Sequence, residues 1–98
     1  MTADGTASFV YVIGATSSRG YKTYVGWTLD PERRLAQHNS GAGAKSTRGR
    51  QWALLYIERF ETRAEAMSRE WHIKRDRQFR KTLSLSLVAA RNDITPLA

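Results

Sequence analysis

The sequence contains no cysteine, so neither a disulfide nor a thiolate metal site can stabilise its 98 residues. No apolar run approaches the roughly 20 residues that a membrane-spanning helix needs. The first residues, MTADGTAS, lack the basic start and the apolar core of a secretory signal. We therefore expect a cytoplasmic protein with no membrane segment and one modest core, packed largely by its three Trp, four Tyr and three Phe.

Acidic residues are also scarce. Sixteen Lys and Arg stand against nine Asp and Glu, which gives a net charge of +7 and a pI near 10.4. Arg outnumbers Lys by 12 to 4, and Arg is the better bidentate ligand of phosphate. This excess predicts attraction to polyanions, with nucleic acid as the first candidate. The alternative is a surface whose charge only keeps the protein soluble.

Three segments have the composition of strands. Residues 8–15, SFVYVIGA, are aromatic and β-branched with apolar residues on both faces, which predicts a strand buried on two sides. TSSRG at 16–20 is a turn sequence, and 21–27 predict the return strand of a hairpin. Gly26 within that strand indicates a close backbone approach or a bulge. Residues 51–60 predict a third strand, again apolar on both faces.

The first predicted helix has clear end signals. Asp30 suits the N-cap, Pro31 the first helical position and Gly41 the C-terminal end. The next segment, SGAGAKSTRGR at 40–50, reads as a flexible basic loop. Helix and loop together therefore separate the second strand from the third.

Two further helices are predicted after the third strand. A capping box of Thr62 and Glu65 opens the first of them, which ends near Lys74. A basic link at 75–81 leads into a last helix at about 78–90. The alternation in LSLSL is a competing strand signal within that helix.

The predicted order of elements is ββαβαα, an α+β domain with a three-stranded antiparallel sheet flanked by helices. We expect this domain to occupy residues 8–90. The segments outside it, 1–7 and 91–98, are expected to be a disordered N-terminal tail and a C-terminal tail.

Glu70 breaks the pattern of its helix. At about 100° per residue it falls in the middle of the apolar face. The members of that face are Ala66, Met67, Trp71 and Ile73. An acid there is unfavourable unless it is paired or holds a cation. Two explanations stay open: an ion pair with Lys74 one turn later, or a carboxylate with a function.

Arg34 and His38 lie one turn apart at the edge of the buried face of the first helix. Taken singly, Arg34 reads as a rim residue that pairs with Asp30 or Glu32. His38 reads as a half-buried histidine favoured by the dipole at the helix end. Neither residue identifies a site alone.

Two tyrosine motifs precede that helix. FVY at 9–11 followed by YVG at 24–26 resembles the paired motif of the GIY-YIG nuclease superfamily. Tyr11 matches the tyrosine of the first motif and Tyr24 that of the second. Phe9 replaces the glycine of the first motif. By themselves, tyrosines central in strands are more often packing residues.

The resemblance extends to three more positions. The family carries an arginine ten positions after the second tyrosine, which selects Arg34 over Arg33, and a Tyr or His four residues later, which is His38. Its metal-binding glutamate lies on the second helix, where Glu70 falls. The resemblance covers about residues 8–81 and is closest to small bacterial members and to flap- and junction-cleaving endonucleases.

The resemblance implies an endonuclease that hydrolyses DNA phosphodiester bonds with Mg²⁺ or Mn²⁺, selective for branched or flapped structures. Glu70 would hold the metal, and Arg34 would stabilise charge on the phosphoryl group. Tyr11 and His38 are both candidates for the base that activates water, and Tyr24 would bind the phosphate or the water. The alternatives are a nucleic-acid-binding module with little cleavage, or a domain that needs a partner for targeting.

The remaining cations are candidate contacts to the phosphate backbone. They are Lys45, Arg48 and Arg50 in the loop, and Arg75, Arg77, Arg80 and Lys81 in the link. A solvated basic face is the alternative for each of them. DNA is the expected partner. The sequence leaves the oligomeric state open, a monomer included.

Overall fold

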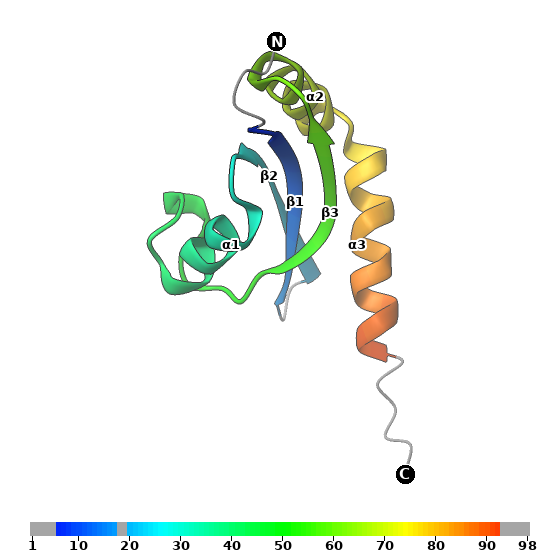
Figure 1. The fold of residues 1–98 in the computed structure, drawn as a ribbon. Helices are drawn as coiled ribbons and strands as arrows, with labels where there is room; N and C mark the ends of the chain where they lie inside the picture. Colours follow the sequence, from blue (N-terminus) through cyan, green and yellow to red (C-terminus); the bar gives the residue numbers. More distant parts are fainter. Residues whose placement is uncertain (1–5, 18–19, 93–98) are drawn as a thin grey trace.

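Three antiparallel strands form the sheet of this protein, whose computed structural model describes residues 6–17 and 20–92 (Figure 1). They are β1 (Ser8–Ser17), β2 (Gly20–Thr28) and β3 (Ala53–Phe60), in the order β2-β1-β3. The first strand is therefore central, and it pairs with β2 along its whole length. This arrangement leaves β2 at one edge of the sheet and β3 at the other.

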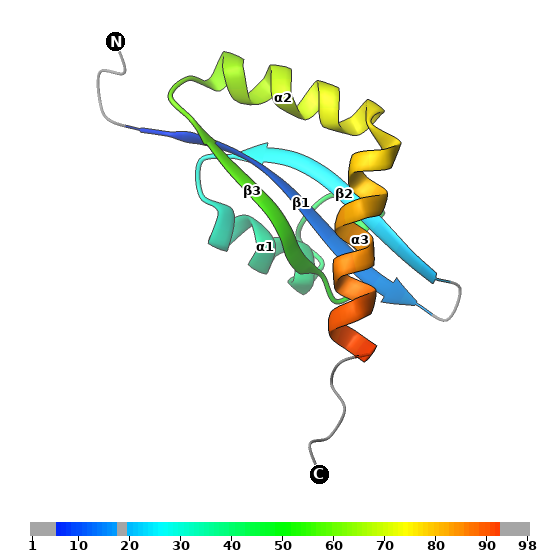
Figure 2. The same ribbon diagram turned by 90° about the vertical axis from the view of Figure 1, so that its right-hand side faces the viewer.

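Helices cover both faces of the sheet. Helix α1 (Pro31–Ser40) lies on one side, while α2 (Arg63–Arg75) and α3 (Arg77–Asn92) lie on the other (Figures 1 and 2). The predicted α+β class and the order ββαβαα are confirmed. Among the described residues, none of the helices combines the length and the apolar character of a membrane span.

The predicted end signals of α1 and α2 are confirmed. The side chain of Asp30 accepts a hydrogen bond from the backbone N–H of Arg33, and Gly41 has a φ of 88°, in the left-handed region. Thr62 and Glu65 form both bonds of the capping box. These helix ends follow from residues within one turn of each other, so sequence alone locates them.

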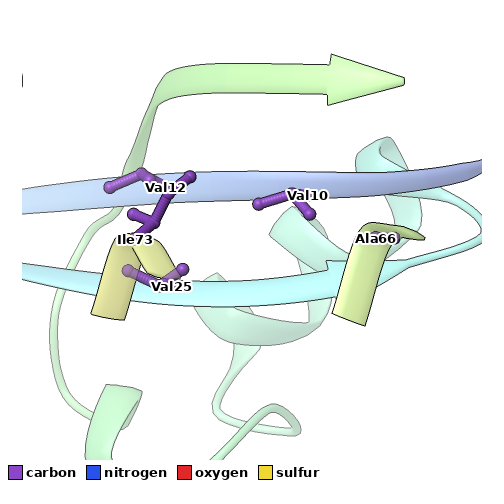
Figure 3. Packing of buried hydrophobic residues seen from close by; sticks show 5 residues of the cluster. All are labelled: Val10, Val12, Val25, Ala66 and Ile73. Carbon is purple, nitrogen blue, oxygen red and sulfur yellow. The ribbon is translucent and has the colours of Figure 1, made fainter. Parts of the chain in front are cut away.

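Strand β1 supplies two different cores. Val10 and Val12 point toward α2 and α3 and are fully buried with Val25, Ala66 and Ile73 (Figure 3). The alternate residues of β1 point toward α1. Tyr11, Ile13 and Ala15 form a second buried cluster there together with Trp52, which precedes β3. The prediction of a strand buried on both faces is confirmed.

The basic link predicted at 75–81 is wrong. Helix α2 ends at Arg75 and α3 begins at Arg77, with only Asp76 between them. The Asp76 carboxylate accepts the backbone N–H of Phe79 at 2.9 Å and so caps α3. The LSLSL segment belongs to α3, and its Ser84 satisfies its hydroxyl by donating to the Arg80 carbonyl.

The predicted buried face of α2 is only half correct. Ala66 and Ile73 are buried, whereas Met67 is 47% exposed and Trp71 52% exposed. Arg75 stacks on the Trp71 ring with its guanidinium carbon 3.7 Å from the ring centroid. Glu70 consequently lies at the border between the buried stripe and solvent rather than at the centre of an apolar face.

Candidate active site

Three rings from three elements meet on the α1 face of the sheet. Tyr11 lies on β1, Tyr24 on β2 and His38 on α1. The ring of His38 is 4.8 Å from that of Tyr24 and 5.8 Å from that of Tyr11, centroid to centroid. Tyr11 and His38 are buried and Tyr24 is half-buried. The two predicted tyrosines and the predicted histidine therefore form one cluster.

Gly26 makes room for this cluster. It pairs with Tyr11 across the β1–β2 ladder. A Cβ at this position would lie 2.5 Å from the Tyr11 hydroxyl and 2.7 Å from the ring carbon that carries it. The close approach predicted at Gly26 is confirmed, because no larger side chain leaves space for the tyrosine.

Tyr11 and His38 share a buried hydrogen bond of 2.8 Å between the Tyr11 hydroxyl and His38 Nε2. Burial raises the pKa of Tyr11 to about 12, although the nearby Arg34 guanidinium favours the ionised form. Burial and the same guanidinium lower the pKa of His38. His38 is therefore a neutral imidazole near pH 7, able to accept a proton.

Arg34 lies beside this pair and is half-buried, with its guanidinium donating to Gln37 Oε1 at 2.8 Å. It also lines a cleft of about 380 Å³ between the end of β2 and α1, together with Trp27 and Arg33. Arg33 is exposed, and Arg34 is the arginine whose charge acts on both Tyr11 and His38. The two adjacent arginines therefore differ in exposure and in the groups on which their charges act.

Glu70 lies on α2, the helix on the other side of the sheet from α1. Its side chain is 20% exposed, and Oε2 lies 3.6 Å from Lys74 Nζ. That separation exceeds the 2.7–2.9 Å of a charge-assisted hydrogen bond, so the pairing is loose. The Glu70 charge also contributes to raising the pKa of Tyr11. The ion pair considered from the sequence is therefore present, and the carboxylate still acts on the tyrosine.

The donor set around Glu70 suits only a lightly held cation. Within residues 6–17 and 20–92, no cluster of three or more His, Cys, Asp or Glu could enclose a metal ion. Mg²⁺ keeps several waters and is commonly held by one or two carboxylates with phosphate oxygens of the substrate. A half-buried Glu70 with a loose lysine partner fits that mode of binding.

A comparison with protein families identifies the domain. The sequence model of the GIY-YIG catalytic domain matches residues 7–83, most of the chain. The chain belongs to the GIY-YIG family. Its α+β fold is therefore that of a GIY-YIG catalytic domain.

Relatives of this GIY-YIG domain are small proteins designated UPF0213, names that state no activity. One from Clostridium perfringens is 44% identical over 69 residues, which are 69% of this chain and 71% of the relative. Another, from Streptococcus pneumoniae serotype 4, is 42% identical over 86 residues, 87% of this chain and 84% of the relative. The solution NMR structure of a Bacillus halodurans member is 35% identical, covers 83% of this chain and 84% of that one, and has a TM-score of 0.44.

The loop of the GIY-YIG domain between α1 and β3 is the basic segment whose flexibility remains a prediction from the sequence. It contains a short 3-10 helix, η1 (Lys45–Thr47), whose Thr47 is fully buried. Thr47 Oγ1 lies 2.8 Å from His38 Nδ1. A Cβ on Gly43 would lie 2.5 Å from the same nitrogen, so this glycine lets the loop lie against the ring. Sequence analysis missed both residues, because a single Thr in a Gly-rich basic loop carries no distinguishing pattern.

The predicted phosphate contacts fall into two groups on opposite faces of the sheet (Figure 1). Lys45 and Arg48 are exposed at η1, and Arg50 is half-buried.

Arg77 and Lys81 of the second group are exposed on α3. With Arg80, Tyr21, Thr23 and Ser84 they line a hollow of about 460 Å³. Arg75, also exposed, is engaged in its stack on Trp71.

Proposed function

We propose that this GIY-YIG domain is a divalent-metal-dependent endonuclease that hydrolyses DNA phosphodiester bonds. The observation that carries the proposal is the hydrogen bond of 2.8 Å from the Tyr11 hydroxyl to His38 Nε2, beside the half-buried Arg34. A tyrosine, a neutral histidine and a fixed positive charge next to a cleft supply what water attack on a phosphodiester needs.

The proton path runs from water through Tyr11 to His38. A tyrosine with a pKa of about 12 is a poor base by itself near neutrality. It can take a proton from water if its own proton moves at the same time to Nε2 of the neutral His38. This supports His38 as the final acceptor and Tyr11 as the group that holds the water, the two roles that the sequence left open.

Arg34 and Glu70 act on the phosphoryl group. Arg34 lines the cleft, and its guanidinium would donate two parallel hydrogen bonds to phosphate oxygens as their charge grows. Glu70 would hold Mg²⁺ or Mn²⁺, which when bound supplies charge neutralisation at the phosphate and the leaving oxygen. Tyr24 would hydrogen-bond a phosphate oxygen or the water.

The step balances as a simple hydrolysis. The water oxygen forms a bond to phosphorus while the bond from phosphorus to the 3′ oxygen breaks with its electron pair. One water proton passes to Tyr11 as the Tyr11 proton moves to His38 Nε2, and the leaving oxygen takes a proton from solvent. His38 then returns its proton to the Tyr11 oxygen as Tyr11 releases one to solvent. The products are a 5′ phosphate and a 3′ hydroxyl.

The distribution of cations supports a path for DNA along the β2 edge. Residues at one end of β2 line the cleft with Arg34, and residues at its other end line the hollow with Arg77 and Lys81. A single rigid duplex meets opposite faces of a sheet less readily than a junction with strands that diverge. This favours branched or flapped DNA as the substrate, with backbone contacts that salt weakens.

The test is cleavage of labelled flap, fork and linear duplex DNA with Mg²⁺ or Mn²⁺. We expect Arg34→Ala and Glu70→Gln to lower the rate of cleavage by about 100-fold or more while DNA binding is retained. The matched control is Arg33→Ala, which removes the same charge from the adjacent, exposed position and should change the rate only a few-fold. Equal loss in Arg33→Ala and Arg34→Ala would contradict the role of Arg34.

A binding module with little cleavage is the alternative, with or without a partner that supplies targeting. The pairing of Glu70 with Lys74 favours it, because even at 3.6 Å the ammonium competes with a metal ion for the carboxylate. DNA binding without metal-dependent cleavage of any of the three substrates would support the module. Cleavage that Glu70→Gln leaves unchanged would remove the metal assignment.

A further inference from the structure

The hydroxyl of Thr47 has one proton, and the geometry shows where it lies. Thr47 Oγ1 is 2.7 Å from the carbonyl oxygen of Ala44 and 2.8 Å from His38 Nδ1. Two oxygens at 2.7 Å repel each other unless a proton lies between them, so the hydroxyl donates to Ala44. Thr47 Oγ1 must then accept from His38, and the proton of the imidazole is on Nδ1.

The position of the proton on Nδ1 also decides the direction of the hydrogen bond at Nε2 of the same imidazole. A neutral imidazole carries one N–H, and a proton on Nδ1 leaves a lone pair on Nε2. The Tyr11 hydroxyl therefore donates to Nε2 across their 2.8 Å hydrogen bond. The chain of donors runs from Tyr11 to His38, Thr47 and finally the Ala44 carbonyl. Each group in this chain donates its hydrogen to the next one.

The loop is held so that this direction is the only one available. The indole of Trp52 donates to the Thr47 carbonyl at 2.7 Å. The Asn39 side chain in turn bonds both the backbone N–H and the carbonyl of Trp52. Gly43 lies against the ring at Nδ1, and His38 and Thr47 are fully buried. Water is thus kept from this edge of the imidazole.

We propose that Thr47 is a positioning residue for the reaction, because it fixes His38 as the tautomer whose Nε2 can accept the proton of Tyr11. Neutral histidine in water favours the opposite tautomer, with its proton on Nε2, which could not accept it. The partner of one ring nitrogen decides the state of the other. The catalytic consequence rests on the proposed function, whereas the tautomer itself does not.

NMR of protein with ¹⁵N-labelled histidine tests the tautomer directly. A ring nitrogen with a lone pair resonates well downfield of one that carries hydrogen. His72 Nδ1 lies 2.8 Å from the Ser68 carbonyl and must donate to it, so His72 is an internal example of the Nδ1–H state. We expect Nδ1–H in the wild type and in Thr47→Ser, which keeps the hydroxyl, and a shift toward Nε2–H in Thr47→Val. Ser46→Ala removes an exposed hydroxyl from the same turn and should leave the spectrum unchanged.

A wild-type spectrum with the proton on Nε2 would overturn the proposal, and so would Nδ1–H retained in Thr47→Val. If Thr47→Val does not fold, Thr47→Ala replaces it and the wild-type spectrum still decides the direction of the chain. In the cleavage assay, we expect Thr47→Val to lower kcat by about 10- to 100-fold with KM unchanged, and Thr47→Ser to restore it. Absence of cleavage by the wild type would defeat the proposed function and leave the NMR result standing.

Discussion

The two faces of the sheet share strand β1 and differ in chemistry. The face toward α2 and α3 buries aliphatic side chains such as Val10, Val12 and Ile73. The face toward α1 buries Tyr11 with the polar groups of His38 and Thr47. Alternation along one strand therefore serves two purposes, with stability on one face and chemistry on the other.

The difference lies in how each face tolerates change. Aliphatic packing loses free energy in proportion to the volume removed, and its contacts have no direction. A buried polar network depends on direction, since each donor needs its acceptor. Every buried side-chain polar atom of the described residues has a hydrogen-bond partner. Perturbing one face at a time should thus separate folding from activity.

The largest effect on stability is expected from Ile73→Ala on the aliphatic face. Ile73 is fully buried, and its truncation leaves a cavity, so the free energy of unfolding should fall by about 2–5 kcal/mol. Urea unfolding measures this loss. Ile57→Ala, at an exposed position of β3, should cost much less. An altered His38 tautomer in the folded Ile73→Ala protein would show that the two faces are not independent.

A smaller loss is expected from Gly26→Ala, which perturbs the polar face. The added Cβ would overlap the Tyr11 hydroxyl, so we expect about 1–3 kcal/mol of destabilisation and a broken Tyr11–His38 hydrogen bond. Urea unfolding and the ¹⁵N spectrum of His38 report the two effects. The control is Val25→Ala on the opposite face of β2, which should lower stability and leave the His38 spectrum intact. Gly26→Ala with an unchanged His38 spectrum would contradict the tight fit.

The smallest effect is the response of stability to acid. The folded protein lowers the pKa of His38 below its ordinary value of 6.5, because burial and the Arg34 charge disfavour the imidazolium. Between that lowered pKa and 6.5 the unfolded chain binds more protons than the folded chain. The free energy of unfolding should therefore rise with pH through this window and fall on acidification.

Denaturant unfolding at a series of pH values measures that dependence. His38→Gln should flatten the slope, whereas His72→Gln, which removes an exposed histidine, should retain it. A slope that persists in His38→Gln would assign the effect to another group. The rate of cleavage should also fall below the lowered pKa of His38, because the imidazolium cannot accept the proton of Tyr11.

The elements of this fold were largely predictable, and the exceptions have a common cause. The ends of α1 and α2 depend on caps that act within one turn, and these were located correctly. The junction at Asp76 was missed, because basic residues suggested a link and one aspartate both ends α2 and caps α3. Met67 and Trp71 were misplaced, since the depth of each helix face depends on how the helix lies against the sheet.

The residues of the candidate site likewise divide into those that the sequence predicted and those that it missed. The spacing of the motifs led to Tyr11, Tyr24, Arg34, His38 and Glu70, and it separated Arg34 from Arg33. It gave no indication of Gly43 or Thr47, and it left the direction of the proton path open. The roles of these two residues and the direction of the proton path depend on how the loop folds. Its buried Thr47 forms a hydrogen bond with His38, nine residues earlier in the chain.

Local pattern and residue spacing were enough to predict the α+β order, the capped helices, the basic surplus and the family. The contact of Tyr11 with His38, 27 residues later in the chain, and the place of Thr47 on the other side of the His38 ring emerge only from the folded protein. A hydrogen bond needs a donor, an acceptor and a direction within about 3 Å. Spacing along a chain can bring such groups near one another, but packing fixes which way the proton points.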